Sequence, residues 1–395
     1  MNRLSEMIYL DNAATTPLDP EIIALLQGAM RDHFANSGTA YSIGLDAKKR
    51  VEEATEIIAQ SLGIPSTHRL IFTSGGTESN NLFIKGLCFP DKKTAYLGLE
   101  HPSITETLDS FKNFGNEPLS LLEYQKEGRL DLSCIPLLKE KRIRLLCLSH
   151  VNNELGAINN ATALITRLEN EAPQTRLFLD GVQAVGKIKL EKSMWAGLAG
   201  YSLSAHKIHG PKGIGLLIYD SRLQLNPQMH GGKQQFGVRA GTLPVPLILG
   251  LAEAVKRVTS RQYETEEHLK KLNAHLINGL RKLNSPELKI LINSGAYQSP
   301  AIVNFSFPPV EGEVILHHLE KQQIYVGMGS ACSAHSKEPS KILTGIGLTD
   351  EQARCSLRIS FSLGNTIDEI DEFLLAFKEA YQTLLPAFDQ KLTNR

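Results

Sequence analysis

Three short segments place polar side chains directly after short apolar runs, and the first of them could bind a phosphate group. In Thr73-Ser-Gly-Gly-Thr-Glu-Ser79, Gly75 and Gly76 allow the backbone to turn tightly, and Thr77 adds a hydroxyl. A helix-like stretch follows, so the free N–H groups and the positive dipole end of a helix N-terminus would face an anion. An ordinary strand–helix turn with Thr77 as the N-cap is the alternative interpretation.

The other two segments carry a carboxylate and a lysine at the ends of apolar runs. Asp180 closes the run Phe178-Leu-Asp180, at the edge where ligands bind in open α/β sheets. A carboxylate buried there needs a cationic or hydrogen-bonding partner, such as a protonated ring nitrogen. Lys207 follows Ser204 and His206, and a lysine in a desolvated cleft can attack a carbonyl carbon. A helix cap at Asp180 and a basic surface turn at Lys207 are the alternatives.

Together, the three segments supply a phosphate cradle, an acidic partner for a ring nitrogen and an imine-forming lysine. Pyridoxal 5′-phosphate (PLP) needs these three anchors, because the protein must hold the cofactor, tune its ring nitrogen and present the substrate to it. The combination predicts a PLP enzyme in which Lys207 bonds covalently to the cofactor.

The pattern of apolar runs predicts an α/β fold that would bring these segments together. Short runs, apolar on both faces, alternate with longer helix-like stretches from about residue 20 to residue 260. This alternation is typical of a mostly parallel sheet covered by helices on both faces. The expected strands cover residues 69–73, 94–99, 144–149, 176–180, 201–204 and 213–219, and the expected helices include residues 20–30, 46–62 and 247–258.

The pattern of expected helices and strands changes after about residue 259. A long charged helix is expected over residues 261–283, and mixed strands and helices follow over residues 301–307, 312–321, 323–326, 357–360 and 367–384. Such a mixture is typical of a smaller α+β domain. We therefore expect a large domain over residues 18–258 and a small domain formed by residues 1–17 and 259–395.

The composition favours a globular enzyme of two packed domains. The chain has 395 residues and a formal net charge of zero, so no long-range field attracts nucleic acid or an anionic membrane. A signal-peptide pattern and a membrane-spanning run are both missing, which leads us to expect a cytoplasmic protein. The five cysteines form no C-x-x-C pair, so a disulfide framework and a zinc site are not expected, nor is any other metal. Cys147, inside an apolar run, is expected to be a core thiol.

The motifs resemble those of the group I cysteine desulfurases of the class V aminotransferase family, which are fold-type I PLP enzymes. The resemblance implies a mostly parallel seven-stranded sheet with helices on both faces and a smaller α+β domain. The matching segments lie in family order over nearly the whole chain. They are Tyr9-Leu-Asp-Asn-Ala-Ala-Thr-Thr-Pro17, Phe72-Thr-Ser-Gly-Gly-Thr-Glu-Ser-Asn80, Glu100-His101, His150-Val-Asn-Asn-Glu-Leu-Gly156, Asp180 with Gln183, Ser204-Ala-His-Lys207, Gly210-Pro-Lys-Gly-Ile-Gly215, Met229-His-Gly-Gly232, Arg239-Ala-Gly-Thr-Leu-Pro244, Gly329-Ser-Ala-Cys-Ser333 and Leu357-Arg-Ile-Ser360.

The resemblance also implies roles in the cofactor site. Asp180 is expected to pair with the ring nitrogen, Gln183 to donate to the ring oxygen, and His101 to stack on the ring and move protons. Thr242 matches a residue that reaches the phosphate from the neighbouring subunit, which implies a homodimer with composite active sites. The expected phosphate-binding residues are Gly75, Gly76, Thr77, Ser204 and His206.

Three residues match groups that bind the substrate in the family. Asn153, which is also expected to contact the cofactor, and Arg358 are expected to hold the substrate carboxylate, which suits a planar guanidinium. A charge at an exposed strand end is the alternative for Arg358. Asn36 begins Asn36-Ser-Gly-Thr-Ala-Tyr41, where the family usually reads Asn-Pro-Ser-Ser-x-His near the substrate entrance; Tyr41 stands in place of the histidine.

Cys332 decides which reaction is expected. It lies in the small, polar stretch 327–337, which is typical of an exposed loop and favours a reactive thiol. The resemblance implies conversion of L-cysteine to L-alanine, with Lys207 removing the Cα proton and the Cys332 thiolate attacking the substrate sulfur. The resulting Cys332 persulfide would pass its sulfur to an acceptor protein, for iron–sulfur cluster assembly or tRNA thiolation.

Two other functions stay open at this point. One is a different PLP reaction of the same family, such as a selenocysteine lyase or an aminotransferase or lyase for another amino acid. The other is a catalytically weak protein whose main role is to bind sulfur acceptors. The presence of Cys332, Lys207, Asp180 and His101 in one chain favours the desulfurase over both.

Overall fold

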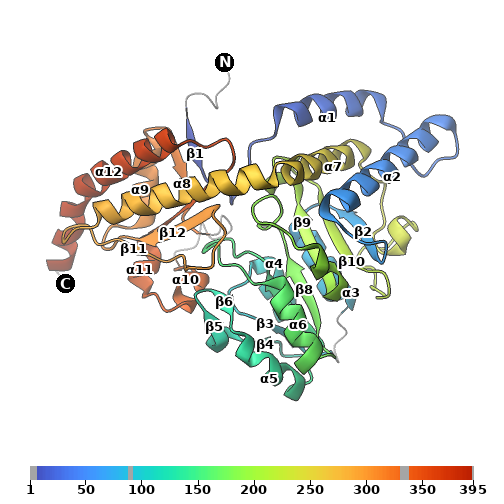
Figure 1. Ribbon diagram of the computed structural model, residues 1–395, viewed down its shortest axis with the longest axis horizontal. Helices are drawn as coiled ribbons and strands as arrows, with labels where there is room; N and C mark the ends of the chain where they lie inside the picture. The colour runs from blue at the N-terminus through green and yellow to red at the C-terminus, as the bar shows by residue number, and fades with distance from the viewer. Residues whose placement is uncertain (1–6, 88–91, 330–337, 394–395) are drawn as a thin grey trace.

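The computed structural model describes residues 7–87, 92–329 and 338–393. Figure 1 shows a broad part built around a large sheet and a narrower part that holds the first strand and the C-terminal elements. Helices α7 (Val245–Ser260) and α8 (Gln262–Leu283) run nearly end to end across both parts. The division into residues 18–258 and residues 1–17 with 259–395 stays a prediction.

Seven strands form the central sheet, in the order β2-β10-β9-β8-β7-β3-β4. Strand β10 (Gly215–Asp220) is antiparallel to both of its neighbours, and the other pairs are parallel. The prediction of a mostly parallel seven-stranded sheet is therefore confirmed. The remaining strands are β2 (His68–Thr73), β3 (Thr94–Tyr96), β4 (Leu119–Ser120), β7 (Leu145–Ser149), β8 (Arg176–Asp180) and β9 (Leu198–Ser204).

Helices cover both faces of the sheet, which explains why its strands are apolar on both sides. In β7 and β8, Leu146 and Leu179 pack into the core on one face, and Cys147 and Phe178 pack into the core on the other. Burial of each such Leu or Phe side chain stabilises the fold by roughly 1.5–3 kcal/mol. Helices α1 (Pro20–Asp32), α2 (Ser42–Leu62), α5 (Ile135–Glu140), α6 (Ala161–Glu171) and α7 contribute to the first core, and α3 (Gly76–Leu87) and α4 (Pro102–Asp109) contribute to the second.

A separate hydrophobic core lies in the narrower part and confirms the smaller α+β unit. Its aromatic centre is formed by Phe305, Phe307 and Phe377, in which the Phe377 ring makes edge contacts with the other two. An antiparallel three-stranded sheet and a two-stranded parallel sheet line this core with helices beside them. These elements are β11 (Leu291–Ile292), β12 (Ile302–Ser306), β14 (Ser356–Ser360), β1 (Ile8–Leu10), β13 (Ile324–Val326), α8, α9 (Gly312–Glu320) and α12 (Ile367–Thr393).

The remaining elements are short. Within the described residues, no helix combines the length and the apolar character that a membrane crossing needs. The short elements are the hairpin strands β5 (Gln125–Lys126) and β6 (Arg129–Leu130), helices α10 (Lys341–Gly345) and α11 (Asp350–Arg354), and the 3-10 helices η2 (Ser110–Phe114), η3 (Leu122–Tyr124), η4 (Leu132–Cys134), η5 (Lys192–Gly197), η6 (Ala205–Lys207) and η7 (Gln235–Gly237).

The segment 11–16, which follows β1, connects the two parts of the molecule. Asp11 Oδ1 accepts a hydrogen bond from Arg358 Nη2 at 2.7 Å, on strand β14 of the smaller core. Five residues later, the Thr16 N–H donates to the carbonyl of His206 at 2.8 Å, beside the large sheet. Since Arg358 is only 2% exposed, its charge depends on the Asp11 carboxylate for compensation.

We expect Asp11→Ala to destabilise the protein by about 3 kcal/mol, because the substitution leaves a buried guanidinium without its carboxylate. Asp32→Ala is the matched control, since Asp32 pairs with Arg31 on the surface and such pairs contribute about 0–1 kcal/mol. Thermal unfolding followed by circular dichroism compares the two variants with the parent protein. Equal midpoints for both variants would contradict a structural role for the Asp11–Arg358 pair.

Candidate active site

A cavity of about 260 Å³ lies where β7, β8 and β9 end. These three strands are parallel, so the polar residues at their carboxyl ends, Ser149, Asp180 and Ser204, meet at one edge of the sheet. The complete lining is Ala13, Ala14, Gly76, Thr77, His101, Ser103, Ser149, Val151, Asn153, Asp180, Val182, Gln183, Ser204, His206, Lys207 and Arg358.

The cavity brings together most of the residues that the sequence suggests for the site. Gly75 precedes the lining residue Gly76, and a Cβ atom on Gly75 would lie 3.7 Å from Ser204 Oγ. Asn36 and Thr242 are exposed and do not line the cavity. The Asn36 Oδ1 atom instead accepts a hydrogen bond from the Gly38 N–H at 2.9 Å, so its role in substrate binding stays a prediction. Cys332 lies outside the described residues.

One end of the cavity is formed by the start of helix α3. Gly76 is its first residue, and a Cβ atom there would lie 2.6 Å from Val182 Cγ2, so only glycine fits between the helix and the segment after β8. His206 Nδ1 lies 3.1 Å from Thr15 Oγ1, and burial, with Lys207 adding to its effect, lowers the pKa of His206 to about 4. His206 is therefore a neutral imidazole at neutral pH.

The Asp180 carboxylate is held by two donors at the bottom of the cavity. Its Oδ1 atom accepts from the Val182 N–H at 2.9 Å, and its Oδ2 atom accepts from Asn80 Nδ2 at 2.7 Å. Asn80 is buried in α3 and also bonds Ser103 and Ser202. Sequence reasoning missed this role of Asn80, because Asn80 lies among polar residues, Glu78 to Asn81, at the start of the helix.

His101 faces the cavity at the N-terminus of α4. Its Nδ1 atom accepts from the Ser103 N–H at 3.1 Å, which caps the helix and leaves the ring proton on Nε2. Burial lowers the pKa of His101, with Lys207 adding to the lowering and Asp180 opposing it. The ring is consequently neutral at neutral pH and carries one N–H that is free to take part in proton transfer.

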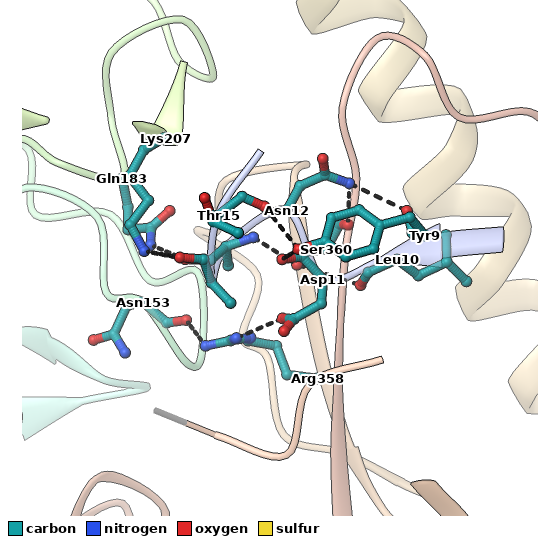
Figure 2. A network of polar contacts seen from close by, with 12 residues as sticks. Tyr9, Leu10, Asp11, Asn12, Thr15, Asn153, Gln183, Lys207, Arg358 and Ser360 are labelled. Carbon is teal, nitrogen blue, oxygen red and sulfur yellow. Dashed lines mark hydrogen bonds and ion pairs between the residues drawn. The ribbon is translucent and has the colours of Figure 1, made fainter. Parts of the chain in front are cut away.

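Lys207 lies at the end of η6, directly after β9. Its Nζ atom donates to the backbone carbonyls of Ala13 and Ala14, each at 2.6 Å (Figure 2). Both carbonyls belong to the segment 11–16, so the amine is directed at the wall of the cavity that this segment forms. A lysine held by two neutral carbonyls at a cavity is positioned to act as a nucleophile once it loses its proton.

Arg358 enters the cavity from the opposite side, on strand β14. Its Nη1 atom donates to the Asn153 carbonyl at 2.9 Å and its Nη2 atom to Asp11 (Figure 2). Two buried atoms of these residues, Arg358 Nε and Asn153 Oδ1, have no hydrogen-bond partner among the described residues. Because buried polar groups are nearly always paired, both atoms indicate that a polar ligand binds here.

Gln183 forms part of the cavity wall beneath the segment 11–16. Its Nε2 atom donates to the Ala13 carbonyl at 2.8 Å, and its Oε1 atom accepts from Lys187 Nζ at 2.5 Å. Sequence reasoning missed Lys187, because a lysine is ordinarily a surface residue.

The described residues on either side of Cys332 in the sequence both approach Glu154. The Ser340 hydroxyl donates to Glu154 Oε2 at 2.6 Å, and a Cβ atom on Gly329 would lie 3.3 Å from the same oxygen. Glu154 is buried and follows the lining residue Asn153. Gly329 and Ser340, which flank the segment that contains Cys332, therefore both lie next to the wall of the cavity.

Comparison with known proteins identifies relatives that match most of the chain. The model of the aminotransferase class-V family matches residues 8–373. The cysteine desulfurase IscS of Dictyoglomus turgidum is 34% identical over 376 residues, which is 92% of this chain and 92% of that protein.

Solved structures are similar over the same extent. A NifS-like protein superimposes with a TM-score of 0.87 and 27% identity, covering 96% of this chain and 100% of that one. The structure of SspA in complex with cysteine gives a TM-score of 0.76 and 29% identity, covering 91% and 100% of the two chains. With a family match across most of its length and a relative of 34% identity, the chain belongs to the aminotransferase class-V family.

Proposed function

We propose that this protein is a PLP-dependent cysteine desulfurase, which converts L-cysteine to L-alanine and passes the sulfur through Cys332 to an acceptor. The observation that carries the proposal is that Lys207, Asp180 and Arg358 line one cavity although they come from different segments of the chain. The similarity to a relative named cysteine desulfurase and to a structure in complex with cysteine supports the choice of substrate.

The residues of the cavity fit PLP. The start of α3, with Ser204 and the neutral His206, offers donors for a phosphate, and the Gly76 position has no room for a side chain that would block them. Asp180 supplies the carboxylate for a protonated ring nitrogen, and Lys207 supplies the amine for the aldehyde. The unpaired Arg358 Nε atom fits the carboxylate of an amino acid.

When bound, PLP withdraws electrons from the substrate Cα and so acidifies its proton. In the proposed reaction, Arg358 binds the substrate carboxylate, and Asp11 and the Asn153 carbonyl hold the guanidinium in place. Lys207 then accepts the Cα proton, and Asp180 keeps the ring nitrogen protonated. The neutral His101 is placed to exchange a proton through Nε2.

In the sulfur-transfer step, the Cys332 thiolate attacks the sulfur of the substrate. A sulfur–sulfur bond forms, the carbon–sulfur bond breaks, and its electron pair remains with the substrate carbon, which is then protonated and leaves as alanine. The enzyme keeps the sulfur as a persulfide on Cys332. We propose a sulfur carrier or a scaffold for iron–sulfur clusters or tRNA thiolation as the acceptor; the cytoplasmic location stays a prediction.

The function is tested by product analysis of the purified, PLP-loaded protein with L-cysteine and a thiol reductant. We expect alanine and sulfide in equal amounts, because each carbon–sulfur cleavage releases one of each. A keto acid in place of alanine would instead assign an aminotransferase, and turnover of L-selenocysteine alone would assign a selenocysteine lyase. Either result would overturn the proposal.

We expect Cys332→Ala to keep the visible absorption of the PLP-loaded protein but to slow sulfide release at least about 100-fold, because the nucleophile is removed. Cys134→Ala is the matched control. Burial raises the pKa of the Cys134 thiol to about 11, so it holds almost no thiolate at neutral pH, and its loss should leave sulfide release near the parent rate. Sulfide release by Cys332→Ala at the parent rate would show that the relay through this residue is wrong.

We also propose that two copies of the chain form a dimer in which Thr242 reaches the phosphate of the partner's cofactor. Thr242 is exposed, and the ion pair between Arg239 and Glu78 (2.8 Å) ties the segment before it to the start of α3. Two large apolar side chains are exposed. Phe236, a few residues before Thr242, is 66% exposed, and Phe34, just after α1, is 74% exposed. Exposed apolar residues of this size favour a protein–protein contact.

Mixing two inactive variants tests the composite site. Lys207→Ala removes the amine of a subunit's own site, and Thr242→Asp places a negative charge against the partner's phosphate. After dissociation and random reassociation, half of the dimers carry one intact site, so about a quarter of the parent activity should return. A mixture as inactive as its components would show that Thr242 and Lys207 serve the same subunit's site.

A further inference from the structure

Lys187 is a buried lysine for which the proposed reaction has no role. It is 7% exposed, and its Nζ atom donates to Gln183 Oε1 at 2.5 Å. None of the carboxylates in the described part of the chain forms an ion pair with it. Since a buried ammonium without a carboxylate is costly, its position calls for a functional explanation.

The Lys187–Gln183 pair separates two cavities. Gln183 lines the active-site cavity, and Lys187 lines a second cavity of about 280 Å³ under helix α7. Lys207 borders both cavities. Lys187 therefore reaches the active site through the Gln183 amide.

The hydrogen bond from Lys187 determines which way the Gln183 amide points. A primary amide presents one acceptor oxygen and two N–H donors. A charged lysine can only donate, so protonated Lys187 binds the oxygen and turns the nitrogen toward the active-site cavity. One N–H of that nitrogen bonds the Ala13 carbonyl, and the second is left for a ligand.

Several charges act on Lys187, and most of them are positive. Burial lowers its pKa to about 7, and Lys207 and Arg358 add to the lowering, whereas a bound anion would favour the charged form. Other titratable or charged groups in range are His206 and His209, together with Asp19, Arg257 and Arg261 across the second cavity.

We propose that Lys187 is a positioning residue, which orients the Gln183 amide as a donor toward the bound PLP and adds a positive charge on that side. The inference rests on the proposed function. It predicts that Lys187 influences the protonation of the Lys207-bound cofactor, which absorbs visible light, without touching the substrate.

The test is a pH titration of the visible absorption of the purified PLP-loaded protein. Lys187→Met removes the charge and the donor but keeps the length of the side chain. A nearby positive charge disfavours protonation, so its loss should raise the midpoint of the absorption change by about one pH unit. Lys189→Met is the matched control, because Lys189 is 70% exposed, and its titration should follow that of the parent.

A double variant tests whether the effect passes through Gln183. If it does, adding Lys187→Met to Gln183→Leu should shift the midpoint by less than Lys187→Met does alone. Should Lys187→Met fail to fold, Lys187→Gln takes its place, since it removes the charge and should raise the midpoint in the same direction. A folded variant that titrates like the parent overturns the inference, whereas a parent protein that gains no visible absorption with PLP overturns the proposed function itself.

Discussion

The ion pair between Asp11 and Arg358 connects the N-terminal segment to the smaller core at the wall of the active-site cavity. Arg358 is almost completely buried, so its guanidinium keeps its charge and its orientation only while the Asp11 carboxylate is present. The same segment accepts two hydrogen bonds from Lys207 and one from Gln183 through its next residues. The relative position of the amine and the guanidinium therefore depends on a few residues near the start of the chain.

The electrostatics of the cavity suit a ligand with several negative charges. Lys207 and Arg358 supply positive charge, Lys187 adds to it when it is protonated, and burial keeps His101 and His206 neutral by lowering their pKa values. Asp180 is the exception, and its two N–H donors replace the water that it loses on burial. A phosphate and a carboxylate could bind here without competing acidic groups, while Asp180 attracts a protonated ring nitrogen.

The sequence predicted those site residues that follow apolar strands. Asp180, Ser204 and Lys207 could be recognised because the ends of short apolar runs in an α/β pattern point to one edge of the sheet. Asn80 and Lys187 could not be recognised in this way, since one lies inside a helix and the other in a turn. Their roles follow from burial, and burial depends on which elements pack over them. The two-residue strand β4 also left no pattern in the sequence.

The sequence by itself determined the α/β pattern of the longer strands and helices, the glycine turn at the start of α3, the residues at the strand ends and the polar context of Cys332. These are local properties, which depend on the residue types and spacing within one segment. The tertiary structure decided which strands are neighbours, that Asp11 reaches Arg358, that Asn80 holds the Asp180 carboxylate, and that Lys187 lies between two cavities. Each of these depends on contacts between segments distant in the chain and on the removal of water around them, and no local pattern records either.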